Sequence, residues 1–85
     1  MMVRIEVKLK RGHFDPEGNV TAKSLRDLGF SVGGVRVSKV YTVELDTNNK
    51  ERAMSLAQEM CRKLLANPTK DDFFIEVLLG EGGAD

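Results

Sequence analysis

The sequence predicts a small α+β domain close to a ferredoxin-like layer, with two helices on one face of an antiparallel or mixed sheet. Three observations support this class. Residues 3–10 alternate strictly between apolar and charged side chains, which indicates a strand with one buried face. Apolar residues within 53–65 recur at spacings of three and four, which is typical of an amphipathic helix. β-rich stretches at 35–45 and 73–79 complete the order β-α-β(β)-α-β.

A helix start follows the first strand. Asp15 has the residue type of an N-cap, Pro16 fits the first helical position, and Glu17 supplies an acidic first turn. Gly18 is unfavourable inside that turn, because glycine loses more backbone freedom in a helix than other residues do. The helix is therefore expected to begin at Pro16 or as late as Asn19.

This first helix is expected to end at Gly29, since glycine readily adopts the left-handed conformation of a C-terminal cap. Phe30 is expected to pack back against the helix after the cap. The buried side of the helix should carry three apolar residues, Ala22, Leu25 and Leu28. Residues 31–34 contain two adjacent glycines and are expected to form a flexible connector.

The next segment, residues 35–45, is the most β-rich part of the chain, and Lys39 interrupts its alternation. The residues of one parity are Val35, Val37, Tyr41, Val43 and Leu45. One long strand with a bend near Ser38 and two strands joined by a tight turn there both fit this pattern. The lack of a strong hairpin dipeptide such as Asn-Gly favours the long or bulged strand.

The second helix is preceded by several possible N-caps at 46–49 and is followed by Pro68, where a helix should stop. Its apolar side should carry Ala53, Leu56, Ala57, Met60, Leu64 and Leu65. A last strand is expected to reach Leu79. Residues 1–79 should thus form a single domain, and the Gly-rich residues 80–85 a flexible C-terminal tail.

Composition narrows the classes of function. The chain has 13 Lys and Arg residues against 13 Asp and Glu residues, a net charge of +0. Nucleic-acid-binding domains usually carry a basic excess, so a nucleic-acid partner is not expected. The single cysteine, Cys61, cannot form an internal disulfide, which suits a cytoplasmic location. The alternating N-terminal residues lack the pattern of a signal peptide or of a membrane span.

No group of residues has the pattern of an active site, so no catalytic residue is expected. His13 is the only histidine, and no serine or cysteine lies beside it to act as a nucleophile. Cys61 is close to the C-terminal end of its helix, where the helix dipole disfavours a thiolate, so we expect a buried structural thiol. Gly33 and Gly34 lack the Lys-Ser/Thr ending of a phosphate loop. Neither a metal site nor a bound cofactor is expected.

Six residues are candidates for contact with a partner. A charged centre is unusual in an otherwise Val-rich strand, and this singles out Arg36, Lys39 and Tyr41. The middle of that strand faces either a partner or solvent, and the sequence fits both. His13 and Phe14 lie in a loop, where they are not needed for packing. The candidate interface is therefore His13, Phe14, Asp15, Arg36, Lys39 and Tyr41.

Four segments, in order, resemble the motifs of the PurS family. Residues 7–18 contain Val-Lys-Leu-Lys and then Asp-Pro-Glu-Gly, which resembles an "LK-x-G-x-x-DPxG" opening. Leu25, Leu28 and Gly29 match a helix that ends in Leu-Gly. Residues 35–39 are similar to "VRxGK", although a serine replaces the usual glycine and makes a tight turn there less favourable. Residues 60–67 resemble an "MCxKLLAN" helix end.

This resemblance covers residues 3–77 and implies the small, non-catalytic subunit of phosphoribosylformylglycinamidine synthase, an ATP- and glutamine-dependent amidoligase of purine biosynthesis. It implies a PurS-like fold and two partners, a large ATP-dependent synthetase subunit and a glutaminase subunit. The small subunit of the family bridges these two, is associated with the passage of ammonia between their active sites, and forms homodimers or homotetramers. ATP and magnesium would then be used by the synthetase subunit and not by this chain.

Rival functions fit the residues less well. A ferredoxin-like regulatory domain that senses a small molecule is suggested only by the Gly33-Gly34 loop, and stabilisation of the isolated protein by one metabolite would distinguish it. A phosphate or acyl-phosphate hydrolase would need an anion-binding arginine and a water-positioning asparagine, for which Arg11 and Asn19 qualify by residue type alone. An RNA-recognition domain is disfavoured by the lack of paired aromatic residues on the strands.

Overall fold

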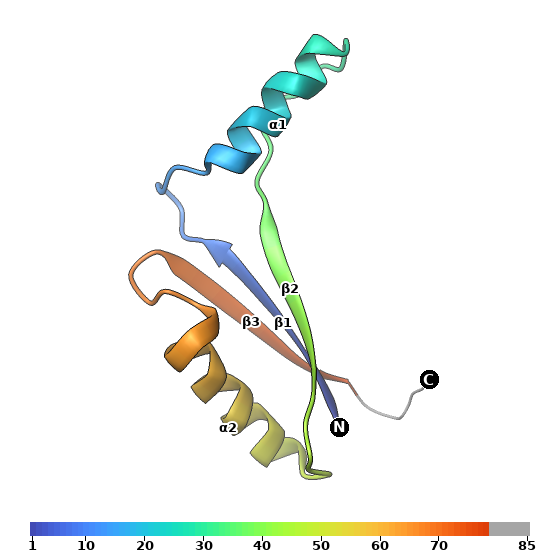
Figure 1. Cartoon of the computed structure of the whole chain (residues 1–85), viewed down its shortest axis with the longest axis vertical. Helices are drawn as coiled ribbons and strands as arrows, with labels where there is room; N and C mark the ends of the chain where they lie inside the picture. Colours follow the sequence, from blue (N-terminus) through green and yellow to red (C-terminus); the bar gives the residue numbers. More distant parts are fainter. Residues whose placement is uncertain (79–85) are drawn as a thin grey trace.

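The structure, a computed structural model, describes residues 1–78, so Leu79 and the predicted tail 80–85 lie outside the described residues. Its elements in chain order are β1 (Met2–Leu9), α1 (Pro16–Asp27), β2 (Ser38–Glu44), α2 (Lys50–Met60), the π-helical turn η1 (Cys61–Leu65) and β3 (Asp71–Leu78) (Figure 1). The strands form an antiparallel sheet in the order β2-β1-β3. The α+β class and the order of elements predicted from the sequence are confirmed.

The hydrophobic core lies between the central strand β1 and helix α2. Val3, Ile5 and Val7 are buried on one face of β1. Ile5 is paired with Tyr41 of β2 and with Ile75 of β3, and all three side chains lie on the same face of the sheet. Burial of a large aliphatic side chain contributes about 1.5–3 kcal/mol to folding, so this face of β1 is a main source of stability.

The segment 35–45 contains one strand, β2 (Ser38–Glu44), which is shorter than the β-rich stretch of the sequence. β2 starts only at Ser38, and residues 35–37 are irregular backbone that leads into it. Ser38 pairs with Lys8 of β1, so the alternative of two strands joined by a tight turn is wrong. Both β2 and β3 pair with β1 alone and are edge strands of the sheet.

Helix α2 is capped by Asn49, which is one of the possible N-cap residues predicted at 46–49. The Asn49 side chain accepts a hydrogen bond from Arg52 N–H at 2.8 Å. Ala53, Ala57 and Cys61 then recur at a spacing of four, and all three are fully buried in the core with the β1 side chains. This face of α2 therefore covers the sheet as the periodicity predicted.

The π-helical turn η1 changes which residues at the end of this helix are buried. Ala66 N–H donates to Cys61 O at 2.9 Å, a step of five residues that widens the last turn. Ala66 is consequently the next buried residue after Cys61, and Leu65 is partly buried beside it. Leu64 is 82% exposed, so the prediction that it belongs to the apolar side is wrong.

Helix α1 begins at Pro16, so the later start is excluded, and it ends in the predicted glycine cap. Gly29 has a φ of 100°, in the left-handed region. Its N–H donates to Arg26 O at 2.9 Å, and Phe30 N–H donates to Leu25 O at 3.0 Å. These two bonds form a Schellman motif, which satisfies the last carbonyl groups of the helix.

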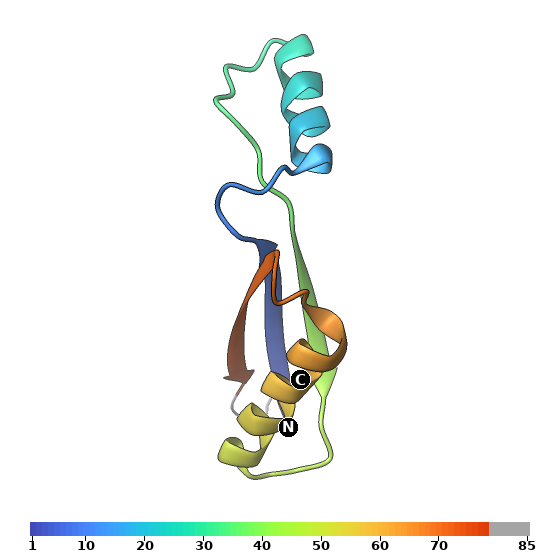
Figure 2. The same cartoon turned by 90° about the vertical axis from the view of Figure 1, so that its left-hand side faces the viewer.

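Helix α1 stands beyond the end of the sheet, whereas α2 covers one face of it (Figures 1 and 2). The hydrophobic core contains no residue of α1. Ala22 is buried, but Leu28 and Phe30 are 74% and 60% exposed, so the predicted packing of these two residues is wrong. Because no sheet lies beneath α1, the prediction that two helices cover one face is correct for α2 alone.

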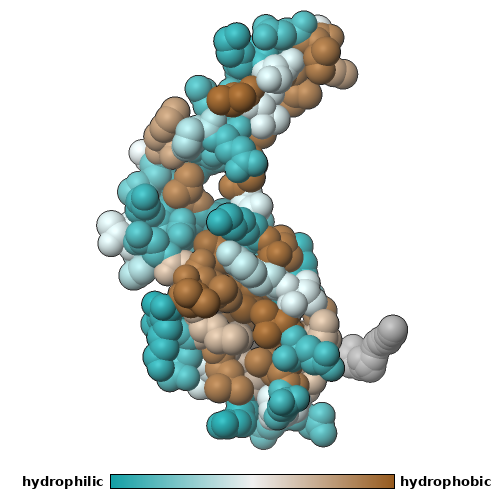
Figure 3. Space-filling model, in the orientation of Figure 1, coloured by the Kyte–Doolittle hydropathy of each residue, from teal (hydrophilic) through white to brown (hydrophobic). Residues whose placement is uncertain are grey.

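The described part of the chain is elongated. Its extents are 48 × 31 × 14 Å, and its radius of gyration is 16.2 Å. A compact domain of this length would have a radius of gyration of about 12 Å. Figure 3 shows hydrophobic side chains on the surface of the sheet–α2 body and also along α1. The chain thus leaves apolar surface that it does not cover by itself.

Candidate functional site

Between the sheet and α1 the molecule narrows to two chain segments, residues 10–15 and 35–37, which we call the neck (Figure 2). The first segment runs from β1 to α1, and the second returns to β2. The base of the neck is tied to the loop before β3, because Lys10 N–H donates to Lys70 O at 2.7 Å. The neck therefore decides where α1 stands relative to the sheet.

The Asp15 carboxylate joins the two segments of the neck. Its Oδ1 accepts Gly18 N–H at 2.8 Å and caps α1, while its Oδ2 accepts Val37 N–H at 2.8 Å. Arg36 Nε lies 4.0 Å from the same Oδ2. The hydrogen bonds from Val37 and Gly18 hold the pKa of Asp15 below its ordinary value. One side chain thus starts α1 and also fixes the segment that returns from it.

Gly18 marks a close approach of the returning chain to α1. A Cβ atom at this position would overlap the carbonyl oxygen of Val35 and would lie 2.8 Å from Asp15 Oδ2. Only a residue without a Cβ atom fits here. The contact explains why glycine occupies a first helical turn, where its own conformational preference is unfavourable.

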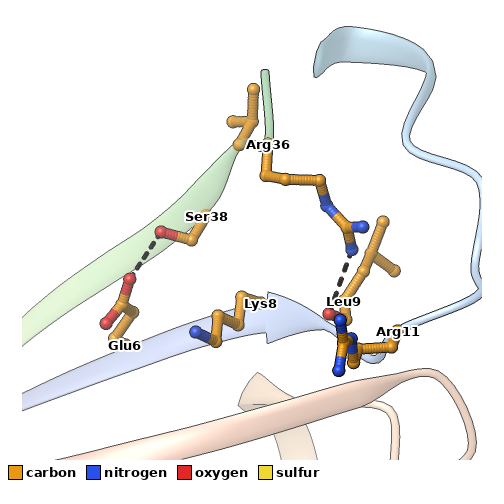
Figure 4. A pocket seen from close by; sticks show the side chains of 7 residues that line it. Glu6, Lys8, Leu9, Arg11, Arg36 and Ser38 are labelled. Carbon is orange, nitrogen blue, oxygen red and sulfur yellow. Dashed lines mark hydrogen bonds between the residues drawn. The ribbon is translucent and has the colours of Figure 1, made fainter. Parts of the chain in front are cut away.

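A pocket of about 290 Å³ opens beside the neck, on the face of the sheet away from α2 (Figure 4). We call it the open-side pocket. Its lining residues are Glu6, Lys8, Leu9, Arg11, Arg36, Val37 and Ser38. Arg36 Nη2 donates to Leu9 O at 3.2 Å, and Ser38 Oγ donates to Glu6 Oε2 at 2.8 Å. The pocket therefore has a cationic end at the neck and one carboxylate toward the sheet.

Two further pockets adjoin the neck. One, of about 350 Å³, includes Lys39, Asp15 and Leu65 in its lining, on the α2 side. The other, of about 290 Å³, lies against α1 and includes His13 and Phe14. Both pockets are lined by charged and apolar side chains together, which is the composition of a contact surface rather than of an enclosed ligand cavity.

The structure brings together five of the six predicted interface residues, which all line pockets at the neck: His13, Phe14, Asp15, Arg36 and Lys39. Tyr41 is the exception. It lies farther along β2, opposite Ile5, and packs partly buried against the hydrophobic core. Lys39 and Tyr41 lie on the face of the sheet that α2 covers, because they pair with Val7 and Ile5, whereas Arg36 lines the pocket on the opposite face.

Cys61, the one thiol, is fully buried, and desolvation raises its pKa even though Arg62 acts in the opposite direction. The prediction of a buried structural thiol is confirmed. His13 lies in the neck, while Cys61 is in the core beside α2. Within residues 1–78, no three His, Cys, Asp or Glu side chains are grouped closely enough to hold a metal ion. No helix of this region is long and apolar enough to cross a membrane.

The open-side pocket contains residues that the sequence did not single out for partner contact, namely Glu6, Lys8 and Arg11. In the sequence, the first two are solvent-facing positions of an alternating strand, and Arg11 follows that strand. They meet Arg36 because Lys8 pairs with Ser38 across the two strands. The signal is charge gathered where the end of β1 meets the start of β2, and it becomes visible only once the pairing of the two strands is known.

The fold and the neck define a class of protein: a small α+β chain whose described residues assemble exposed charge and apolar surface but no nucleophile beside a base. The family whose sequence profile matches residues 2–78 is PurS, described as phosphoribosylformylglycinamidine (FGAM) synthase. This chain belongs to the PurS family, as the four sequence motifs implied.

Similar proteins match over most of their length. The phosphoribosylformylglycinamidine synthase subunit PurS of Archaeoglobus fulgidus is 41% identical over 76 residues, covering 88% of this chain and 95% of the relative. The crystal structure of PurS from Methanocaldococcus jannaschii is 36% identical, with a TM-score of 0.85 over 94% of this chain and 98% of that one. It is described as one of the subunits of formylglycinamide ribonucleotide amidotransferase in the purine biosynthetic pathway.

A third likeness is to a chain in the structure of PurLQS from Thermotoga maritima, at 28% identity and a TM-score of 0.81. The match covers 91% of this chain and 95% of that one. Together the comparisons identify this chain as a PurS-type subunit of the synthase of purine biosynthesis, and not as a complete enzyme.

Proposed function

We propose that this chain bridges an ATP-dependent synthetase subunit and a glutaminase subunit within phosphoribosylformylglycinamidine synthase. The observation that carries the proposal is the likeness to a chain of PurLQS, with a TM-score of 0.81 over 91% of this chain. The elongated shape supports it, because a body 48 Å long reaches two partners more readily than a compact one. In this role the chain contributes contacts and no catalytic group.

The partner contacts are proposed to centre on the neck. Phe14 is 72% exposed there, and Arg36 is 56% exposed. Aromatic and arginine side chains are the types most enriched where proteins bind one another. His13, Asp15 and Lys39 line the same region, and Tyr41 is the more distant member of the proposed set.

In the same proposal, ATP and magnesium serve the synthetase subunit, and this chain binds no cofactor. Neither nucleic acid nor membrane is a proposed partner, which agrees with a net charge of +0. The place of action is the cytoplasm, where the lone thiol of Cys61 remains reduced.

A bridging subunit also suits the transfer of ammonia. Ammonia that escapes into bulk water is protonated and lost as a nucleophile, so transfer between two active sites needs a path closed to solvent. We include in the proposal that this chain helps to close that path by covering the junction between the two larger subunits.

Reconstitution tests the bridging function. The isolated chain is expected to turn over neither glutamine nor ATP, whereas mixing it with the two larger subunits should restore glutamine-dependent synthesis. Omission of the chain should abolish that reaction but leave synthesis from added ammonium salt, because only the delivery of ammonia depends on the bridge. Release of glutamate and formation of ADP measure the two half-reactions. Turnover by the pure chain that a point mutation in it abolishes would contradict the proposal.

We also propose that the chain assembles with itself into a homodimer or homotetramer. Three apolar residues at α1 are more than half exposed, namely Val20, Leu28 and Phe30. On the face of the sheet away from α2, Val40 and Phe74 are exposed as well. A helix of 12 residues is only marginally stable without packing, so α1 needs a covering surface that its own sheet does not provide.

Sedimentation equilibrium at micromolar concentration tests self-association. The isolated protein is expected to sediment with at least twice the chain mass of 9.4 kDa, because association would bury the apolar side chains of α1 and the segment 35–45. A purely monomeric species at these concentrations would rule out the proposed oligomer.

A further inference from the structure

The open-side pocket concentrates positive charge in a chain whose net charge is +0. Lys8, Arg11 and Arg36 line it against the single carboxylate of Glu6. We propose that this pocket receives a carboxylate side chain of a larger partner subunit, so that an acidic residue of that subunit anchors to the neck. The inference rests on the proposed bridging function and specifies the chemistry of one of its contacts.

Two of the three cations in the pocket, Lys8 and Arg11, lack a direct ion-pair partner within the described part of the chain. Residues 1–78 contain no ion pair that involves Lys8 or Arg11. Lys8 Nζ lies 5.0 Å from the centre of the Phe74 ring, a cation–π contact that leaves its charge uncompensated. The neighbouring Lys10, by contrast, pairs with Asp72 Oδ1 at 2.7 Å. Within residues 1–78, Lys8 and Arg11 are thus two unpaired cations that line the same pocket.

The Arg36 guanidinium group is held in place by contacts at the neck. Its Nη2 donates to Leu9 O at 3.2 Å, and its Nε lies 4.0 Å from Asp15 Oδ2. The Arg11 side chain lines the same pocket (Figure 4). Two guanidinium groups in one pocket repel each other unless an anion shares them, and their planar forks match a carboxylate in bidentate hydrogen bonds.

The openness of the pocket favours a carboxylate that a protein carries over a free anion. The Arg36 side chain is 56% exposed, and ion pairs at exposed sites contribute little. The Glu6 carboxylate, held by the Ser38 hydroxyl at 2.8 Å, would repel a free dianion such as phosphate. A partner surface that covers the pocket would exclude water from the cations and so strengthen the pair.

The shape of the molecule fits such a partner segment. In Figure 3 the outline is bowed, with its hollow on the side opposite α2. The pocket lies on this face of the sheet, and the exposed side chains of Val40 and Phe74 belong to the same face. When an acidic residue of the partner enters the pocket, the partner residues that flank it can therefore pack against the apolar side chains on this face of the sheet.

The test compares the affinity of the full chain for the purified larger subunits at low and at high salt. Arg11→Gln and Lys8→Gln remove the two unpaired charges without breaking a hydrogen bond within residues 1–78. Each should weaken association by about 10-fold at low salt and reduce its dependence on salt, since charge-assisted contacts are the ones that salt screens. Arg11→Lys should recover part of the loss. Arg52→Gln on α2 removes an equal charge far from the neck and should change affinity by less than about twofold.

Each result has a distinct meaning. No association of the unmodified chain would overturn the bridging function together with this inference. Association at unmodified affinity by both variants would overturn the inference alone. Saturable shifts of the Lys8 and Arg11 amide resonances by millimolar inorganic phosphate, in the isolated chain, would identify a small-anion site instead. A change in sedimentation without a change in partner affinity would show that the occupant is a second copy of this chain, and this too would overturn the proposal.

Discussion

Replacement of Gly18 with alanine is expected to destabilise the neck, although alanine is the better helix former. In an open helix the change would stabilise by about 1 kcal/mol. Here the new methyl group would overlap Val35 O and crowd Asp15 Oδ2. Both atoms belong to the neck, which holds α1 in place. Overpacking of this kind costs roughly 1–3 kcal/mol, so the net effect should be destabilising.

Urea unfolding and amide hydrogen exchange measure this effect at two levels. The unfolding midpoint should fall, and the Val37 N–H, which donates to Asp15 Oδ2, should exchange faster. Gly34→Ala is the matched control, because a Cβ atom there would meet nothing within 4 Å. That control should stay within about 0.5 kcal/mol of the unmodified protein. A higher midpoint for Gly18→Ala would show that helix preference outweighs the close approach.

Asp15→Asn is expected to loosen α1 and to change how stability depends on pH. An asparagine side chain has one acceptor oxygen, so it cannot accept both the Gly18 and the Val37 N–H groups as the carboxylate does. Because the folded-state pKa of Asp15 lies below its ordinary value of 3.8, the carboxylate stabilises the fold above that pH. This contribution is lost as the pH falls through the lowered pKa.

The difference in stability between the unmodified chain and Asp15→Asn should therefore be full at pH 7 and shrink below about pH 4. Thermal unfolding at a series of pH values measures it. Glu17→Gln removes a charge from the same helical turn, where the Glu17 side chain makes no hydrogen bond or ion pair within residues 1–78. It should have the smaller effect at pH 7. A difference for Asp15→Asn that stays constant from pH 7 to pH 3 would contradict the proposed role of its carboxylate.

Local rules predicted the ends of the elements well. The aspartate cap of α1, its glycine stop at Gly29 and the asparagine cap of α2 all depend on neighbouring residues, and all are present. The placement of α1 was not predictable in the same way. Apolar residues on a helix indicate that one side will be buried, but they do not reveal whether the chain's own sheet buries it. Leu64 shows a second limit of sequence periodicity. The widened π-helical turn η1 shifts the buried face of the helix, so that Leu64 is exposed.

In the candidate site, too, the sequence predicted some of the residues and missed others. A charged residue in a Val-rich segment drew attention to Arg36, a loop position away from packing drew attention to His13, and both lie at the neck. Lys8 and Arg11 carried no such signal, because basic residues on the polar face of a strand are ordinary. Their place in the open-side pocket depends on the register that sets Lys8 opposite Ser38, and a single sequence does not encode that register in any local pattern.

The contacts of Gly18 and Asp15 with residues 35–37 affect the position of the far end of α1. A helix of 12 residues is about 18 Å long, so a rotation of about 10° at its base moves its tip by about 3 Å. A small change in the contacts at the base of α1 thus moves its other end by a distance comparable to the size of a side chain. The close approach of the Val35 carbonyl oxygen to Gly18 therefore limits how far α1 can rotate about its base. The proposed contacts of Leu28 and Phe30 with a covering protein surface depend on this limit for their alignment.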